Sequence, residues 1–192
     1  IYVGYRYFET IPKAKDKVNY PFGFGLSYTK FAVKTVGIDI EEGEIRCQVS
    51  VTNIGARAGK EVVQAYYSAP QGRLGKASRV LAAFAKTRML QPGETQLVIL
   101  TWKIADMASY DDCGKICKSA YVLEQGEYHF YIGTSVRNAA DAGMTYTVDK
   151  DTVVEQLTSH LAPTSLSRRL RADGTYEELE VTEPVDTDAN EL

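Results

Sequence analysis

The sequence has few of the residues that disulfide frameworks, metal sites and catalytic triads require: three cysteines, two histidines and a single tryptophan in 192 residues. An odd and low cysteine count is not that of a disulfide framework and favours a reducing, cytoplasmic compartment. Cys113 and Cys117 lie four residues apart, but a zinc site needs two further ligands, and His129 and His160 form no metal-binding motif with them. We expect reduced thiols at both positions and a small core residue at Cys47.

Strong net charge and long apolar runs are also lacking. The chain carries 22 basic and 25 acidic side chains, for a formal charge of −3. So small an imbalance creates no field that would recruit nucleic acid or an anionic membrane, and no apolar run approaches the ~18 residues that span a bilayer. The one dense basic cluster, Arg168, Arg169 and Arg171, stands beside Asp173 and several glutamates, which predicts local ion pairing. We therefore expect an uncharged partner.

Catalytic motifs are missing among the polar residues. The serines lack a G-x-S-x-G context, and the adjacent carboxylates Asp111 and Asp112 would point apart on an extended chain, so we expect both to be solvated. Gly23 and Gly25 form a G-x-G, but the residues after them lead into strands and not into the helix that a phosphate-binding loop requires. The residues thus predict no catalytic group, no cofactor-binding group and no metal ligand.

Residues 19–31, which we call the aromatic loop, are the most unusual stretch. Tyr20, Phe22, Phe24 and Tyr28 place four rings within nine residues, separated by glycines rather than by charges. Each ring would expose a large apolar area if the loop were free in water, so we predict a buried connector clamped between packed bodies. A second interpretation is that one ring lines a ligand cleft at this junction.

Alternating apolar residues and turn signals predict seven strands between residues 30 and 136. The clearest is 45–53, where Ile45, Cys47, Val49 and Val51 alternate with polar side chains. Short strands with turns between them and no helical period predict an all-β, antiparallel sandwich of fibronectin type III or immunoglobulin type. The other strands, of which the last two are expected to form a hairpin across residues 125–126, are 31–40, 61–68, 80–86, 96–104, 119–124 and 127–133.

The flanking segments follow other patterns. Residues 1–9 alternate loosely, as an edge strand or buried turn of another domain would. Residues 152–161 combine a capping box with apolar residues at helical spacing, which predicts a short C-terminal helix ending before Pro163; residues 177–192 are an acidic tail. Because the first residue is Ile1 and not Met, we expect the chain to be a fragment or a cleaved product. This expectation is compatible with a secretory signal segment at the N-terminus of the parent protein.

Several motifs resemble glycoside hydrolase family 3. GYRYF at 4–8 and YPFGFGLSYT at 20–29 are similar to the end of that family's α/β sandwich domain. Five further segments are similar to signatures of the family's fibronectin type III-like domain. They are VTNIG at 51–55, AGKEVVQAY at 58–66, LAAFAK at 81–86, LQPGET at 90–95 and the strand 126–133.

This resemblance implies a part of a retaining, exo-acting β-glycosidase of the β-glucosidase type, which works through a covalent glycosyl-enzyme intermediate and two carboxylates. In the family the nucleophile lies on a barrel domain and the acid/base glutamate on the α/β sandwich domain, and neither motif matches a residue here. The resemblance also makes the aromatic loop the seam between two domains, so Tyr20, Phe22 and Phe24 are candidates for residues beside the cleft. The implied partners are the barrel and α/β sandwich domains and a β-linked oligosaccharide or glycoside.

Three parts are expected: a terminal piece of the α/β sandwich domain with the aromatic connector (1–29), a fibronectin type III-like domain (30–136), and a helix-containing linker with the acidic tail (137–192). Family members typically end soon after the fibronectin-like domain, so the extra residues suggest a permuted order in which the barrel follows. The leading hypothesis is a non-catalytic portion that braces the catalytic domains and is inactive alone. The alternatives are an independent carbohydrate-binding or adhesion module and a metal-binding piece built on Cys113 and Cys117.

Overall fold

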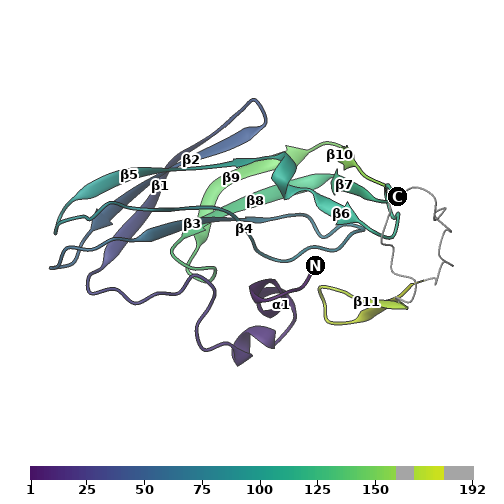
Figure 1. Ribbon diagram of the computed structural model, residues 1–192, viewed down its shortest axis with the longest axis horizontal. Helices are drawn as coiled ribbons and strands as arrows, with labels where there is room; N and C mark the ends of the chain where they lie inside the picture. The colour runs from purple at the N-terminus through teal and green to yellow at the C-terminus, as the bar shows by residue number, and fades with distance from the viewer. Residues whose placement is uncertain (159–166, 180–192) are drawn as a thin grey trace, which may run out of the picture.

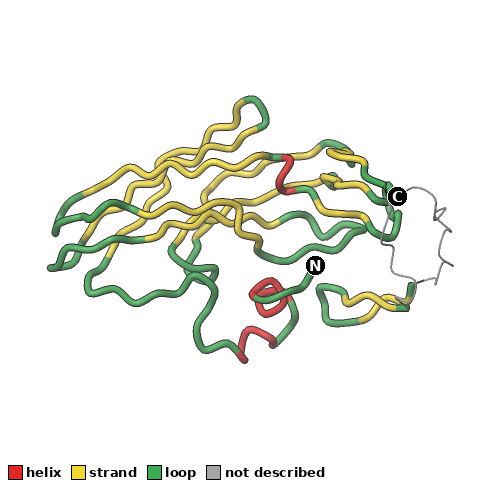
Figure 2. Tube along the Cα trace, viewed as in Figure 1, coloured by secondary structure: helices red, strands yellow, loops and turns green. Residues whose placement is uncertain are grey.

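The computed structural model describes residues 1–158 and 167–179 of the chain. A short helix and a 3₁₀ turn precede a long series of strands (Figure 1, Figure 2). None of the described helices has the length and apolar character needed to cross a membrane. The elements are α1 (Tyr5–Thr10), η1 (Ala14–Lys17), β1 (Phe31–Glu41), β2 (Glu44–Asn53), β3 (Val62–Ser68), β4 (Val80–Lys86), β5 (Thr95–Lys103), η2 (Ala105–Met107), β6 (Ser109–Asp111), β7 (Ala120–Leu123), β8 (Gly126–Gly133), β9 (Ala140–Val148), β10 (Thr152–Gln156), β11 (Arg168–Leu170) and β12 (Tyr176–Glu178).

Two sheets form the body of the molecule. One has the strand order β1-β2-β5 and the other the order β4-β3-β8-β9, and all of these pairings are antiparallel. In Figure 1 their strands run along the long axis of the molecule. Buried side chains from both sheets join in one apolar cluster, as expected for two sheets packed face to face. The predicted class, an all-β antiparallel sandwich of fibronectin type III type, is confirmed.

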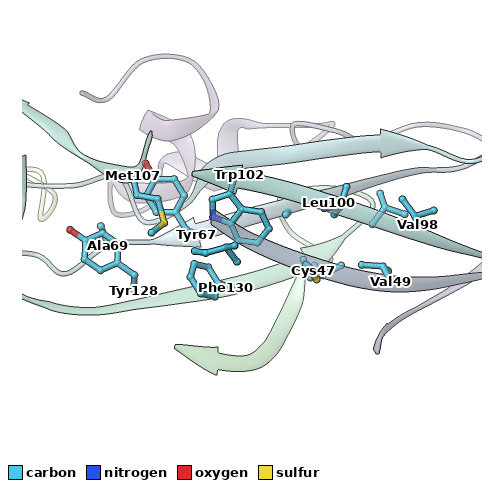
Figure 3. Close-up of a cluster of buried hydrophobic side chains, with 14 of the residues drawn as sticks. Cys47, Val49, Tyr67, Ala69, Val98, Leu100, Trp102, Met107, Tyr128 and Phe130 are labelled. Carbon is cyan, nitrogen blue, oxygen red and sulfur yellow. The ribbon is translucent and has the colours of Figure 1, made fainter. Parts of the chain in front are cut away.

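The core forms because the alternation along each strand turns apolar side chains inward. The inward residues of β2, predicted from that alternation, are fully buried. Between the two sheets the ring of Trp102 meets that of Phe130 edge-on, with centroids 5.4 Å apart (Figure 3). Burial raises the pKa of the Cys47 thiol to about 11, so this thiol stays protonated and serves as the small core residue that was expected.

Two smaller sheets lie at one end of the sandwich. The order β6-β7-β10 forms a three-stranded sheet, and β11 pairs with β12 in a two-stranded hairpin that Figure 1 places below it. The large sheet also gains an edge strand after residue 136, because β9 pairs with β8. The division of the chain into three parts stays a prediction.

The predicted C-terminal helix is wrong over the residues that the structure describes. Thr152–Gln156 form strand β10, which pairs with β7 so that Val153 lies opposite Val122. The β-branched side chains of this segment favour extended backbone, and the edge of β7 offers the hydrogen bonds that a strand needs. This pairing overrides the helical spacing. The end of the predicted helix, with His160, and the predicted stop at Pro163 lie outside the described residues. Residues 180–192 of the predicted acidic tail lie outside them as well.

The predicted hairpin across residues 125–126 is also wrong, although both of its strands exist. β7 pairs with β6 and β10, whereas β8 pairs with β3 and β9. Gly126 adopts a φ of +134°, a conformation that side chains rarely allow, and the chain crosses here from one sheet to another. At the start of the chain, Tyr5–Thr10 form a helix in place of the expected strand or turn.

Candidate functional site

The aromatic loop runs along the outside of the sandwich, between α1 and β1 (Figure 1). The described residues do not bury its side chains: Tyr20 is 72% exposed, Leu26 93% and Tyr28 95%. Several large apolar side chains exposed within one short loop are typical of an interaction surface. Within this chain much of the loop is therefore exposed, and Tyr20, Leu26 and Tyr28 are accessible to another body, whereas the predicted burial between packed bodies stays a prediction.

Phe22 fixes the middle of the aromatic loop to α1. Its ring stacks on that of Tyr5 with centroids 4.3 Å apart and planes 16° apart, and Tyr5 in turn meets the buried ring of Tyr66 edge-on. The Phe22 carbonyl accepts a hydrogen bond from the backbone N–H of Val136 at 2.9 Å. Since such ring pairs add ~0.5–1.5 kcal/mol beyond the burial of their area, the contact orders this part of the loop.

Gln64 of β3 holds the next residue of the loop. Its buried side chain donates from Nε2 to the Thr134 carbonyl at 2.8 Å and to the Gly23 carbonyl at 3.4 Å, and Oε1 accepts from the Tyr66 hydroxyl. Gly23 has a φ of +83°, and a Cβ there would lie 2.2 Å from Gln64 Oε1. Both the backbone conformation and this close approach require glycine at position 23.

Asn53, at the end of β2, fixes the C-terminal end of the loop. Its fully buried amide donates from Nδ2 to the carbonyl oxygens of Arg57 at 2.8 Å and Leu90 at 2.9 Å. Its Oδ1 accepts from Thr29 Oγ1 at 2.8 Å and from the backbone N–H of Gly55 at 3.1 Å. Every donor and acceptor position of the amide is thus satisfied, and one side chain joins the aromatic loop to two turns.

The segment before the loop is attached to the sandwich as well. The backbone N–H of Leu81 in β4 donates to the Tyr5 hydroxyl at 2.8 Å. Arg137 donates from Nε to Glu9 Oε1 at 2.9 Å and from a second guanidinium nitrogen to the Lys15 carbonyl at 3.0 Å. Helix α1 and the residues after it are therefore held against the sheet β4-β3-β8-β9.

The three candidates for cleft-side residues do not act as one cluster. Tyr20 and Phe24 face each other, with ring centroids 5.2 Å apart, and both are exposed. Phe22 points instead toward Tyr5, so it is an anchor of the loop. The proximity of these residues to a cleft stays a prediction.

Asp111 is fully buried, and the expectation that it is solvated is wrong. The chain after it folds back, so that one carboxylate oxygen accepts from the backbone N–H of Lys115 at 3.0 Å and the other from those of Ile116 at 2.7 Å and Cys117 at 2.9 Å. Burial opposes ionisation, but these backbone donors outweigh it and hold the pKa of Asp111 below its usual value. A carboxylate held in this way organises its loop and is not available as a general base.

The basic cluster forms the local ion pairs that were predicted. Arg169 donates to Asp112 Oδ1 at 2.5 Å, and Arg171 Nε lies 3.8 Å from Glu177 Oε2. Among residues 1–158 and 167–179, no group of three or more His, Cys, Asp and Glu side chains is arranged to hold a metal ion.

The fold and its signatures define a fibronectin type III-like domain: residues 61–136 match the family model described as "Fibronectin type III-like domain". Comparison with known proteins then gives the wider relationship. The chain is 57% identical to Beta-glucosidase A of Butyrivibrio fibrisolvens over 97% of its own length, and 47% identical to a β-glucosidase of Ruminococcus albus over 88%. It spans 24% of the first protein and 18% of the second, about a quarter or less of each.

Solved structures agree with the sequence relatives. A β-glucosidase from Paenibacillus barengoltzii superposes with a TM-score of 0.82 at 49% identity, over 92% of this chain and 21% of that one. β-Glucosidase 3B from Thermotoga neapolitana, solved in complex with α-D-glucose, superposes at 0.70 and 38% identity, over 81% of this chain and 20% of that one. The resemblance to β-glucosidases of glycoside hydrolase family 3 is confirmed by both sequence and fold.

The sequence did not single out Gln64 and Asn53 as the residues that hold the aromatic loop. Both are polar side chains at buried positions of strands, where an unpaired amide would be costly. That mismatch is the signal by which they could have been found. The partners that satisfy them lie 41 and 24 residues away in the chain, at Gly23 and Thr29, and periodicity within a strand carries no information about such distant groups.

Proposed function

We propose that this chain is the non-catalytic, fibronectin-like portion of a retaining exo-β-glycosidase of the β-glucosidase type, and that it braces the catalytic domains. The observation that carries the proposal is the aromatic loop, which is fixed to the sandwich in its middle and at its end while Tyr20, Leu26 and Tyr28 face outward. A loop that is fixed to the sandwich and presents exposed apolar side chains is suited to docking, because little conformational entropy remains to be lost on contact.

The charged groups support a structural role. The described residues bury two carboxylates, Asp111 and Glu124. Backbone N–H groups hold the first, and Lys76 lies 3.0 Å from the second. A retaining glycosidase needs two carboxyl groups on either side of the scissile bond, about 5–5.5 Å apart and reachable by the sugar. Groups that are already enclosed and paired do not meet that requirement.

The chain alone should release no product from an aryl β-glucoside. The reason is that its buried carboxylates are structural and the proposed catalytic domains are not part of it. The measurement is the absorbance of released nitrophenol from p-nitrophenyl β-glucoside, with the full-length enzyme as the positive control. Turnover by the 192-residue chain that a substitution within it abolishes would contradict the proposal.

Tyr28→Ala should destabilise the full-length enzyme but not the isolated chain. In the isolated chain the side chain is 95% exposed, so its removal should change the free energy of unfolding by less than about 0.5 kcal/mol. Docked against a catalytic domain, the ring loses water-exposed area, and the same change should cost about 1–2 kcal/mol. Thermal unfolding of both proteins measures this difference. Leu97→Ala, at a half-exposed apolar residue on the outer face of β5, is the matched control, and equal effects of Tyr28→Ala in the two proteins would refute docking.

A further inference from the structure

The hairpin of β11 and β12 stands apart from the two sheets of the sandwich (Figure 1). Among the described residues its strands pair only with each other, and none of residues 167–179 is buried. An isolated two-stranded hairpin is marginally stable at best in water, because it has too little apolar surface to bury. Contacts between its side chains and the rest of the chain therefore decide whether it holds one position.

The loop of residues 112–119, between β6 and β7, supplies these contacts. Its backbone is fixed, because the buried carboxylate of Asp111 accepts three of its N–H groups and the Asp111 carbonyl accepts the N–H of Ser119 at 2.8 Å. Two side chains of opposite charge, Asp112 and Lys115, extend from this loop to the hairpin. A fixed backbone favours their pairing, since less conformational entropy is lost when the contacts form.

The hairpin presents the complementary charges. Arg169 of β11 and Glu177 of β12 lie directly opposite each other in the strand pairing. Arg169 donates to Asp112 Oδ1 at 2.5 Å, and Lys115 Nζ donates to the two carboxylate oxygens of Glu177 at 2.6 and 2.7 Å. The direction of charge is reversed between the two pairs, so an exchange of the two positions would bring like charges together. The arrangement therefore selects one orientation of the hairpin against the loop.

Both ion pairs are partly enclosed. The side chains of Arg169 and Asp112 are 14% and 31% exposed, and those of Lys115 and Glu177 are 21% and 23% exposed. Charges with little water around them attract each other more strongly than charges on an open surface. The hydrogen bond from Lys115 is the main reason why the pKa of Glu177 lies below its ordinary value, so the carboxylate stays charged at neutral pH.

Apolar contacts contribute little to the attachment. Neither of the two apolar clusters of buried residues includes a residue of the hairpin. At its tip, a Cβ placed on Gly174 would lie 3.7 Å from the side chains of Ile11 and Pro12, an ordinary van der Waals distance. Arg168 lies over the ring of Tyr176, but this contact is internal to the hairpin. The two ion pairs are thus the main described contacts between the hairpin and the body of the molecule.

We propose that the hairpin of β11 and β12 is a clasp held by charge: the two ion pairs to the loop 112–119 keep it closed, and it opens while the sandwich stays folded. Opening of this kind is local unfolding, and the sandwich tolerates it because the buried core contains no residue of the hairpin. Closure should therefore depend on ionic strength. The clasp goes beyond the proposed bracing function, because none of its charged groups belongs to the aromatic loop.

Charge reversal in the 192-residue chain tests the clasp, with amide hydrogen exchange followed by mass spectrometry as the measurement. At low salt, Lys115→Glu should speed exchange in residues 167–179 by about tenfold, because it replaces an attraction by a repulsion. Adding Glu177→Lys restores a pair with its signs exchanged and should slow exchange again by at least about threefold. The recovery is partial because Arg171, whose Nε lies 3.8 Å from Glu177, would then face a lysine. Lys34→Glu, at an exposed position of β1, is the control and should change nothing in the hairpin.

Salt provides a test that needs no substitution. Raising NaCl from about 0.05 M to about 1 M should speed exchange in residues 167–179 by about threefold. Peptides from β2, whose inward residues lie in the core, should show no change. An arginine-specific protease gives a second measurement, because Arg168, Arg169 and Arg171 lie in the hairpin and none of the substitutions alters them.

The melting temperature establishes that each variant is folded, and Glu177→Gln serves where Lys115→Glu is not. Equal exchange in the hairpin of Lys115→Glu and of the unsubstituted chain would overturn the proposal. So would the absence of any recovery in the double variant, or exchange in residues 167–179 that does not respond to salt.

Discussion

Replacing Glu124 with alanine should lower the free energy of unfolding by about 3–5 kcal/mol, the largest effect expected of any single substitution considered for this chain. Glu124 and Lys76 are 3% and 4% exposed, with Nζ and Oε2 3.0 Å apart. The same carboxylate accepts the backbone N–H groups of Arg73 at 2.6 Å and Leu74 at 3.3 Å. Alanine would leave a buried ammonium without its counter-ion and two N–H groups without an acceptor.

Urea denaturation followed by circular dichroism measures the effect. Glu127→Ala is the matched control, since that glutamate is exposed and its loss should cost less than about 1 kcal/mol. A double variant, Lys76→Met with Glu124→Leu, removes both charges and should recover the part of the loss that comes from the unpaired ammonium, while the part from the N–H groups of Arg73 and Leu74 remains. A small loss in Glu124→Ala, or no recovery in the double variant, would contradict the stabilising role assigned to the buried Lys76–Glu124 pair.

Asp111→Asn should cost about 3 kcal/mol. The carboxylate accepts three backbone N–H groups, and an amide offers only one acceptor oxygen, so its NH₂ group would face at least one backbone donor. Hydrogen bonds to a charged acceptor are also the stronger kind. Chemical denaturation of the variant at neutral pH measures the loss. Asp39→Asn, at an exposed position of β1, is the control and should change stability by less than about 0.5 kcal/mol.

The same residue sets a pH dependence whose sign follows from its pKa. The folded-state pKa of Asp111 is below the unfolded value of about 3.9, so the folded state holds the proton more weakly. Its contribution is therefore complete above about pH 4 and is lost as the pH falls through the folded pKa. Acid should destabilise the unsubstituted chain more steeply than Asp111→Asn in this window. Parallel stability curves for the two proteins below pH 4 would contradict the assignment.

The strands of the sandwich could be predicted because their information is local. Along β2, apolar and polar residues alternate strictly, and burial follows that alternation residue by residue. The turn at residues 91–94 is local as well, since Pro92 and Gly93 suit its backbone angles and Gly93 adopts a φ of +81°. Six of the seven predicted strands belong to the sandwich, and the seventh, 119–124, belongs to the small sheet.

What failed depended on partners far away in the chain. Residues 152–156 carry β-branched side chains that suit a strand, but only the free edge of β7 decides in favour of it. The carboxylate of Asp111 is buried because the next six residues wrap around it, a backbone path that composition does not reveal. The burial of the aromatic loop between packed bodies stays a prediction: its composition indicates a need for burial, but it does not say which part of a protein supplies the cover.

The attachment of α1 has a mechanical consequence. The Tyr5 hydroxyl accepts a hydrogen bond from the backbone of β4, and the Tyr5 ring stacks on Phe22. At the other end of the loop the Thr29 hydroxyl donates a hydrogen bond to Asn53. Tension applied to the chain at α1 would thus pass sideways into the sheet through these side chains and would not stretch the loop backbone. The exposed rings of the loop are thus anchored on both sides by contacts to the sandwich and not by the loop backbone alone.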